Sequence, residues 1–107
     1  MLQPSTLDPE IRELKELAVF FSALRDVLRL RILLALASSG ELTVTELART
    51  LRVSQPLVSF HLRPLRVLGL VTVRPAGREL YCSIDVEEIQ RRLAGFTERL
   101  DDAIDVC

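Results

Sequence analysis

The segment SQPLVSFHLRPLRVLGL, residues 54–70, places polar, aromatic and cationic side chains on the outside of one helix. Its apolar residues recur at steps of three and four, which predicts an inward stripe of Val58, Leu62, Leu65 and Leu68. The outward positions are then Gln55, Ser59, Phe60, Arg63 and Arg66, with no acid among them. Gln and Ser can read base edges, Arg can bond guanine or phosphate, and an aromatic ring can contact a thymine methyl. This chemistry favours nucleic-acid binding over a plain solvated surface.

Pro64 lies inside this helix, where a proline removes a backbone donor and crowds the preceding turn. Only the hydrogen bond to the Phe60 carbonyl is lost, in the later half of the helix. We hypothesise that the helix bends at Pro64, so that its first two turns follow a groove while its end returns to the core. A straight helix would contradict this hypothesis.

A shorter helix is predicted just before this one. Thr43 and Glu46 have capping-box spacing and open a helix over residues 43–51, while Ser54 caps the next helix, which runs to about residue 68. A tight turn at Arg52-Val53 joins the two. The pair is a helix-turn-helix, whose second helix can project from the body and enter a major groove.

The hydropathy period then changes to two, which predicts strands over residues 70–74 and 79–84. Residues 75–78, Pro-Ala-Gly-Arg, join them as a hairpin turn. Arg74 and Arg78 flank the turn, where a hairpin can reach backbone phosphates or a neighbouring minor groove.

Helices are also predicted on both sides of this unit. One starts at Asp8-Pro9-Glu10, and a second runs from about Asp26 to Ala37, apolar on most sides and therefore expected to be central. Asp85, with Glu88 three residues later, caps a last helix over about residues 85–105. Steps of three and four along it give the narrow seam of a helix that packs against another helix, formed by Val86, Ile89, Leu93, Phe96, Leu100 and Ala103.

These elements predict a mainly α fold with a small β-hairpin (α+β), in the order α-α-α-α-β-β-α, which is a winged helix-turn-helix. Residues 1–8 are expected to be a flexible arm, and residues 9–107 a single domain, which suits a length of 107 residues. Two cysteines, no signal sequence and no membrane-length apolar run indicate a cytoplasmic protein.

The net charge of -1 is unevenly distributed. Residues 43–84 carry six arginines against two acids, whereas residues 85–107 carry three arginines against seven acids. A basic middle suggests an anionic partner that docks there, although the charge alone fits solvated arginines equally well.

At this point the sequence resembles the ArsR/SmtB family of small bacterial winged-helix repressors, over about residues 14–100. Single fragments are weak, but their order and spacing together are specific. They are residues 23–26 (ALRD), 29–33 (RLRIL), 40–44 (GELTV), 46–48 (ELA), 53–56 (VSQP), 58–59 (VS), 61–62 (HL), 65–66 (LR), 69–71 (GLV) and 77–78 (GR) before Tyr81.

The resemblance implies a homodimer that pairs through its first and last helices, with one recognition helix per half-site and repression relieved by an effector. It matches the seam found on the last helix. The expected dimer interface comprises Leu14, Leu17, Phe21, Ile89, Leu93, Phe96 and Leu100.

The chain departs from the family pattern at three places. Val27-Leu28 follow Asp26 where the family often has Pro-Thr, and Arg52 stands in a turn where glycine is common. Phe60 replaces a polar residue, often histidine, before His61. The last departure puts the operator sequence in doubt, and not the DNA binding.

The effector sites of metal-sensing relatives are not matched. Their Cys-x-Cys pattern falls on Thr43 and Thr45, which cannot supply thiolates, and the last helix has no histidine. No cofactor is therefore predicted, although a metal effector remains possible, with Asp101, Asp105 and Cys107 as weak candidate ligands. Cys82 is expected to pack as a small apolar residue, and His61 to be a hydrogen-bonded structural residue or a phosphate contact.

The sequence therefore predicts a homodimeric DNA-binding repressor that is not an enzyme. Gln55, Ser59, Phe60 and Arg63 would read bases, while Thr45, Ser54, Arg74 and Arg78 would hold phosphates. Two alternatives stay open, a winged-helix module that binds a protein partner and a redox-sensing regulator that uses Cys107.

Overall fold

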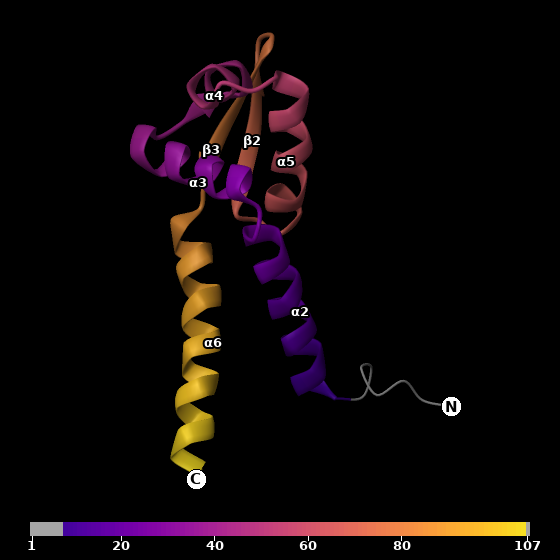
Figure 1. The fold of residues 1–107 in the computed structure, drawn as a ribbon, viewed down its shortest axis with the longest axis vertical. Helices are drawn as coiled ribbons and strands as arrows, with labels where there is room; N and C mark the ends of the chain where they lie inside the picture. The colour runs from indigo at the N-terminus through magenta and orange to yellow at the C-terminus, as the bar shows by residue number, and fades with distance from the viewer. Residues whose placement is uncertain (1–7, 107) are drawn as a thin grey trace, which may run out of the picture.

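The computed structural model describes residues 8–106, which form a body of helices and strands with two long helices extending from it (Figure 1). The body holds α3 (Val27–Ser39), β1 (Leu42–Thr43), α4 (Val44–Leu51), α5 (Gln55–Val67), β2 (Val71–Ala76) and β3 (Glu79–Ile84). The extensions are α2 (Pro9–Leu24) and α6 (Val86–Val106). This is the predicted winged helix-turn-helix, with one strand more than the sequence indicated. The arm predicted over residues 1–8 falls outside the described residues, except for Asp8.

Helix starts lie where the capping residues predict them. The Asp8 carboxylate accepts a hydrogen bond from the Glu10 amide at 2.9 Å, and Asp85 accepts one from the Glu88 amide at 3.0 Å. Asp26 caps α3 by accepting from two backbone amides. Each carboxylate satisfies an N–H group that has no partner within its own helix.

The turn between α4 and α5 explains one departure from the family pattern. Thr43 and Glu46 form both hydrogen bonds of the capping box at the start of α4, and Ser54 caps α5. Between them Arg52 adopts a left-handed conformation, with φ 58° and ψ 47°. Glycine adopts this region without steric cost, which is why a glycine suits the turn. Arg52 therefore adds a charge at some cost in backbone strain.

The sheet is antiparallel, with strand order β1-β3-β2. The sequence pattern did not predict β1, a two-residue strand whose Leu42 pairs with Cys82 and whose Thr43 pairs with Tyr81. The predicted four-residue turn is also too long, because β2 continues through Pro75 and Ala76 and only Gly77-Arg78 turn. Gly77 has φ +61°, and Pro75 is tolerated because β2 is an edge strand.

One apolar core joins the helices of the body to the sheet. It includes three residues of the predicted inward stripe of α5, Val58, Leu62 and Leu65, while Leu68 packs against it from the edge. As expected, α3 is central, since it contacts α2, α4, α5 and β3 and buries Ile32, Leu33 and Leu36. Its opposite face nevertheless exposes Val27, Leu30 and Leu34. Only one face of this helix meets the sheet and α4, so the remaining apolar residues contact solvent.

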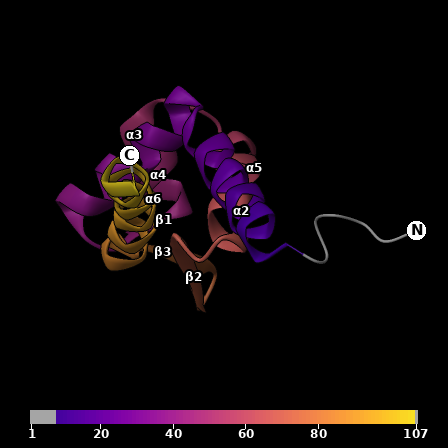
Figure 2. The ribbon, with the colours of Figure 1, turned by 90° about the horizontal axis from the view of Figure 1, so that it is seen from below.

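The two long helices extend from the body side by side (Figure 1 and Figure 2). The rings of Phe21 and Phe96 meet edge to face with centroids 5.4 Å apart. Arg99 of α6 forms ion pairs with Glu13 at 2.7 Å and Glu10 at 3.2 Å on α2. No helix among residues 8–106 is long and apolar enough to cross a membrane.

Candidate nucleic-acid interface

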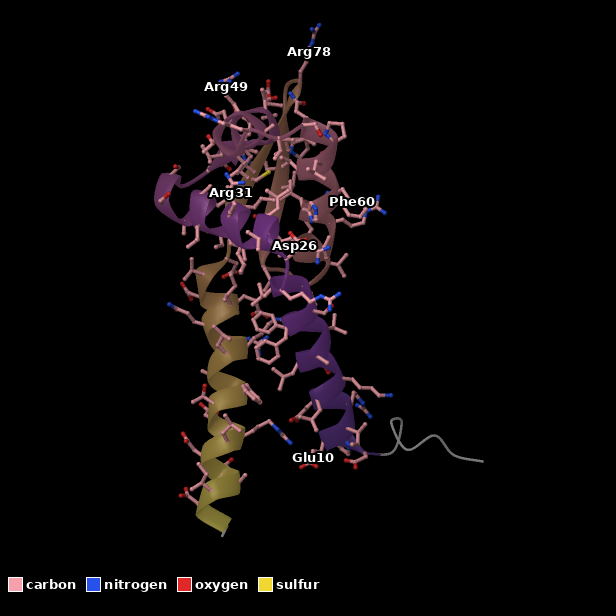
Figure 3. All side chains as sticks on the ribbon, in the orientation of Figure 1. Glu10, Asp26, Arg31, Arg49, Phe60 and Arg78 are labelled. Carbon is pink, nitrogen blue, oxygen red and sulfur yellow. The ribbon has the colours of Figure 1, made fainter. Side chains whose placement is uncertain are left out.

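The outward face of α5 is the centre of the candidate interface. Gln55, Ser59, Phe60 and Arg63 are all exposed, and Phe60 keeps 67% of its surface in contact with solvent. Figure 3 shows the Phe60 ring pointing away from the body. Because the buried stripe of α5 occupies the opposite side, these four predicted base-reading residues lie together on one free surface.

Ser54 and Thr45 are partly engaged within the protein. The Ser54 hydroxyl accepts a hydrogen bond from the Leu57 amide at 3.2 Å, which leaves its own proton free to donate to a phosphate. The Thr45 hydroxyl lies 3.5 Å from the Glu79 carboxylate, to which it donates a long hydrogen bond. Thr45 must therefore leave Glu79 in order to donate to a phosphate.

The two arginines of the hairpin have different surroundings. Arg78 lies at the tip of the β2–β3 hairpin and extends beyond the body (Figure 3). Arg74 instead pairs with Glu41 at 2.9 Å, and its guanidinium carbon lies 4.8 Å from the centroid of the Tyr81 ring. The hydrogen bond from Arg74 also lowers the pKa of the Glu41 carboxyl. Of these two arginines, Arg78 can contact a phosphate without breaking an ion pair of the described residues, whereas Arg74 would have to leave Glu41.

Arg49 was missed by the sequence analysis as a candidate phosphate-binding residue. It lies on the exposed face of α4 and points from the same end of the molecule as Arg78 (Figure 3). The signal was present, since Val44, Leu47, Ala48 and Leu51 define the buried face of α4 and leave Arg49 outside. Arg52, held in the turn before α5, is exposed as well.

His61 is a hydrogen-bonded structural residue, as predicted. Its Nδ1 accepts a hydrogen bond from Arg29 Nε at 3.1 Å and lies 3.9 Å from an Asp26 carboxylate oxygen. Neutral His61 therefore carries its proton on Nε2. The backbone N–H of Arg29 lowers the pKa of Asp26, as do the backbone N–H of Leu28 and the nearby His61. This cluster fixes the start of α3 against the middle of α5.

The α5 helix is continuous through Pro64. The Pro64 carbonyl accepts a hydrogen bond from the Leu68 amide at 3.3 Å, so the last turn stays closed. The bend proposed at Pro64 stays a prediction.

Cysteine and acidic side chains do not assemble a metal site within residues 8–106, where no group of three or more His, Cys, Asp or Glu residues lies close enough to hold an ion. Asp101 and Asp105 are exposed on α6, and Cys107 lies outside the described residues. Cys82 is fully buried, and this burial raises the pKa of its thiol to about 11. A thiol so protonated and enclosed is a poor nucleophile, which supports the packing role expected for it.

The predicted dimer residues fall into two groups. Ile89 packs against the core of its own chain, Phe21 and Phe96 contact each other, and Leu17 is half-buried. Leu14, Leu93 and Leu100 leave 41%, 41% and 48% of their surfaces exposed on α2 and α6. The second group is the part of the seam that a partner chain would cover.

Comparisons with known proteins point to one group. Residues 26–73 match the model of the family described as "Bacterial regulatory protein, arsR family". The chain is 39% identical over 105 residues to a transcriptional repressor SmtB homolog of Synechocystis sp., covering 92% of this chain and 79% of the relative. It is 36% identical over 76 residues to a cadmium resistance regulatory protein CadC homolog of Staphylococcus aureus, covering 71% of this chain and 63% of that relative.

Solved structures agree with the sequence relatives. NolR from Sinorhizobium fredii matches with a TM-score of 0.68 and 35% identity, over 91% of this chain and 95% of that one. An ArsR-like transcriptional regulator from Rhodococcus sp. RHA1 matches with a TM-score of 0.73 and 33% identity, over 85% of this chain and 84% of that one. The SmtB homolog, the CadC homolog and the Rhodococcus protein are regulators of transcription, which agrees with the prediction that this chain is not an enzyme.

Proposed function

We propose, from the premise that the chain belongs to the ArsR/SmtB family and is a DNA-binding transcriptional regulator, that it represses transcription as a homodimer on a two-fold operator. The observation that carries the docking is the exposed, acid-free face of α5 beside the Arg78 hairpin tip. It would act in the cytoplasm.

In this docking α5 enters the major groove with its N-terminal half. Gln55 and Ser59 read base edges, Arg63 bonds a guanine, and the Phe60 ring contacts a thymine methyl. The Ser54 hydroxyl at the start of α5 faces a phosphate, where the positive end of the helix dipole favours an anion. Arg78 reaches the adjacent backbone, and Arg49 supports it from α4.

The dimer would form through α2 and α6. Their exposed leucines, Leu14, Leu93 and Leu100, offer apolar surface whose burial against a second chain is favourable. A two-fold dimer presents two copies of α5 to half-sites about one helical turn, ~34 Å, apart. Dimerisation therefore matches the protein to a palindromic site.

An effector would release the proposed repressor from its operator. The relatives include regulators of metal resistance, yet Thr43 and Thr45 occupy the positions of the usual thiolates in this chain. We propose no resident cofactor and leave metal sensing as a minor alternative.

Selection from a random duplex library tests the proposal. The wild-type protein is expected to enrich one palindromic sequence, whereas Arg63→Gln enriches it with relaxed preference at one base pair in each half-site. Lys15→Gln, which removes one charge from α2 at the far end of the molecule, is the matched control and is expected to select the wild-type sequence. Enrichment of no sequence would instead support the alternative, a module that binds a protein partner through Phe60 and the hairpin.

A further inference from the structure

An apolar groove lies between the C-terminal half of α2 and the later turns of α5, where the two helices meet in Figure 1. It encloses about 530 Å³, which is within the range of roughly 300–1,000 Å³ found for small-molecule sites. Val19 forms one wall, Pro64 and Val67 form the other, and the small residue Ala23 also lines it. The groove therefore borders the helix proposed to read DNA.

The walls of the groove are apolar and poorly covered. Val19 exposes 55% of its surface and Val67 exposes 79%, although both belong to structured helices. Pro64 adds an apolar ring and, having no N–H, presents no donor to the groove. Surfaces of this kind gain free energy when a hydrocarbon displaces water from them.

The polar groups of the groove are mainly two arginines, Arg29 and Arg63, and none of its lining residues is acidic. Arg29 is fixed in place, because its Nε donates to His61 and its Nη1 lies 3.5 Å from the Ala23 carbonyl oxygen. Arg63 differs, since within residues 8–106 no hydrogen bond or ion pair holds it. One cation is thus anchored beside the groove, and the other can turn toward an anion.

We propose that this groove binds an amphipathic organic monocarboxylate, with its hydrocarbon along Val19, Pro64 and Val67 and its carboxylate on Arg63 and Arg29. Guanidinium groups match carboxylates in charge and in hydrogen-bond geometry. A cationic ligand would be repelled by both guanidinium groups, and a neutral one would leave Arg63 without a counter-charge.

The proposed dimer leaves this groove open. Val19, which forms one wall of the groove, lies on a different face of α2 from Leu14, Leu17 and Phe21, whereas Ala18, four residues after Leu14, borders both surfaces. A second chain seated on the leucine seam would therefore not fill the groove.

The regulatory consequence rests on the proposed function, in which Arg63 also reads a base. A bound carboxylate holds Arg63 against α2, so this side chain cannot reach the major groove at the same time. The ligand and the operator then compete for one residue, and the monocarboxylate acts as an effector that releases DNA.

Sodium decanoate is a suitable probe, measured by calorimetry on the full-length protein without DNA. We expect saturable binding of decanoate, and none of acetate or of decyltrimethylammonium. Arg63→Gln is expected to weaken decanoate binding roughly tenfold, because the variant lacks one charge-assisted hydrogen bond to the carboxylate. The matched control Arg66→Gln, on the same helix but outside the groove, is expected to bind like the wild type. No decanoate binding, or an equal reduction in both variants, would overturn the proposal.

Val19→Asp tests the groove and the release of DNA together. Val19 is exposed and belongs to α2, outside the proposed DNA-reading face, so the variant should fold and bind operator normally while the added carboxylate repels decanoate. If circular dichroism shows that it does not fold, Ser22→Asp, also exposed and in the groove, replaces it. We expect decanoate to release the operator from the wild type and not from the variant.

The failures of the two proposals are distinguishable. A wild-type protein that prefers no DNA sequence without decanoate contradicts the proposed function, whatever the calorimetry gives. A protein that binds its operator and retains it when decanoate is saturating contradicts the proposed release.

Discussion

The arginines proposed to contact DNA differ in whether an ion pair within the protein holds their side chains. Arg63 and Arg78 are exposed without an ion pair in the described chain, whereas Arg74 is tied to Glu41 and stacks on Tyr81. The sequence treats Arg74 and Arg78 as equals that flank one turn. The difference arises because the fold brings Glu41 beside β2 from 33 residues away, which no local pattern shows.

A residue-scale prediction concerns Glu88 on α6. Hydrogen bonds from Arg91 and then Arg92 lower the pKa of its carboxyl from 4.5 to about 2. A carboxyl with a lowered pKa in the folded state stabilises the fold above its unfolded pKa, and this contribution disappears as the pH falls through the folded pKa. We expect the melting temperature to drop between about pH 4.5 and pH 2 partly for this reason.

The variant Glu88→Gln measures how much of this loss of stability at low pH is due to Glu88. Thermal melting monitored by circular dichroism should show a smaller loss of stability over this pH range in the variant than in the wild type. Parallel curves for the two proteins would show that Glu88 does not contribute to the acid sensitivity.

At the scale of elements, Arg92 connects three helices. Its Nη2 donates to the Leu68 carbonyl at the end of α5 at 2.8 Å, and its Nε donates to Glu88 at 2.8 Å. Its guanidinium carbon lies 5.6 Å from the centroid of the buried Phe20 ring of α2. The end of the recognition helix is therefore held by a side chain of α6.

Replacement of Arg92 by Met should destabilise the fold measurably. The Leu68 carbonyl would be left without its charged donor in a half-buried site, which costs about 1–3 kcal/mol of unfolding free energy. The matched control is Arg91→Met, whose partner is also Glu88 but whose side chain is 69% exposed, so that about 0.5 kcal/mol or less is expected. Urea denaturation of both variants gives the comparison, and equal destabilisation would contradict the role of Arg92.

Elements with local signals were predictable, and elements made by distant contacts were not. Asp8, Thr43, Ser54 and Asp85 mark helix starts within a few residues of themselves, and these four cap as expected. Asp26, predicted only as an approximate helix start, also caps its helix. The strand β1 has only two residues and exists because it pairs with β3, some 39 residues later. Two residues carry too little periodicity to predict a strand.

In the candidate site, too, features with local sequence signals were predictable and features made by distant contacts were not. The exposed face of α5 could be predicted, because the spacing of its buried residues defines it. The Arg74–Glu41 ion pair, the Arg29–His61 hydrogen bond and the groove beside Pro64 could not, since each joins segments that are distant in the sequence.

The whole molecule is elongated, with extents of 52 × 34 × 22 Å, and its charge follows its length. Residues 43–84, which are rich in arginine, form the end with the hairpin tip, whereas the acidic residues of α6 lie toward the opposite end (Figure 1). Such a separation orients the molecule in the field of an anionic partner. In the proposed docking the basic end meets DNA first, and α2 and α6 remain on the far side, where a second chain would pair with them.

The central claim is that α5 reads sequence while the hairpin tip holds the backbone. A salt titration of binding to the selected operator and to a scrambled duplex tests it most directly, for the wild type, Arg63→Ala and Arg78→Ala. We expect Arg63→Ala to weaken binding by about 1–3 kcal/mol on the operator and little on the scrambled duplex.

Arg78→Ala should weaken both duplexes alike and reduce the slope of log K against log salt by about 1 for each phosphate that Arg78 no longer neutralises. These two patterns together are the result that the proposed docking predicts. If both variants bind the operator with the affinity and salt slope of the wild type, the docking is contradicted.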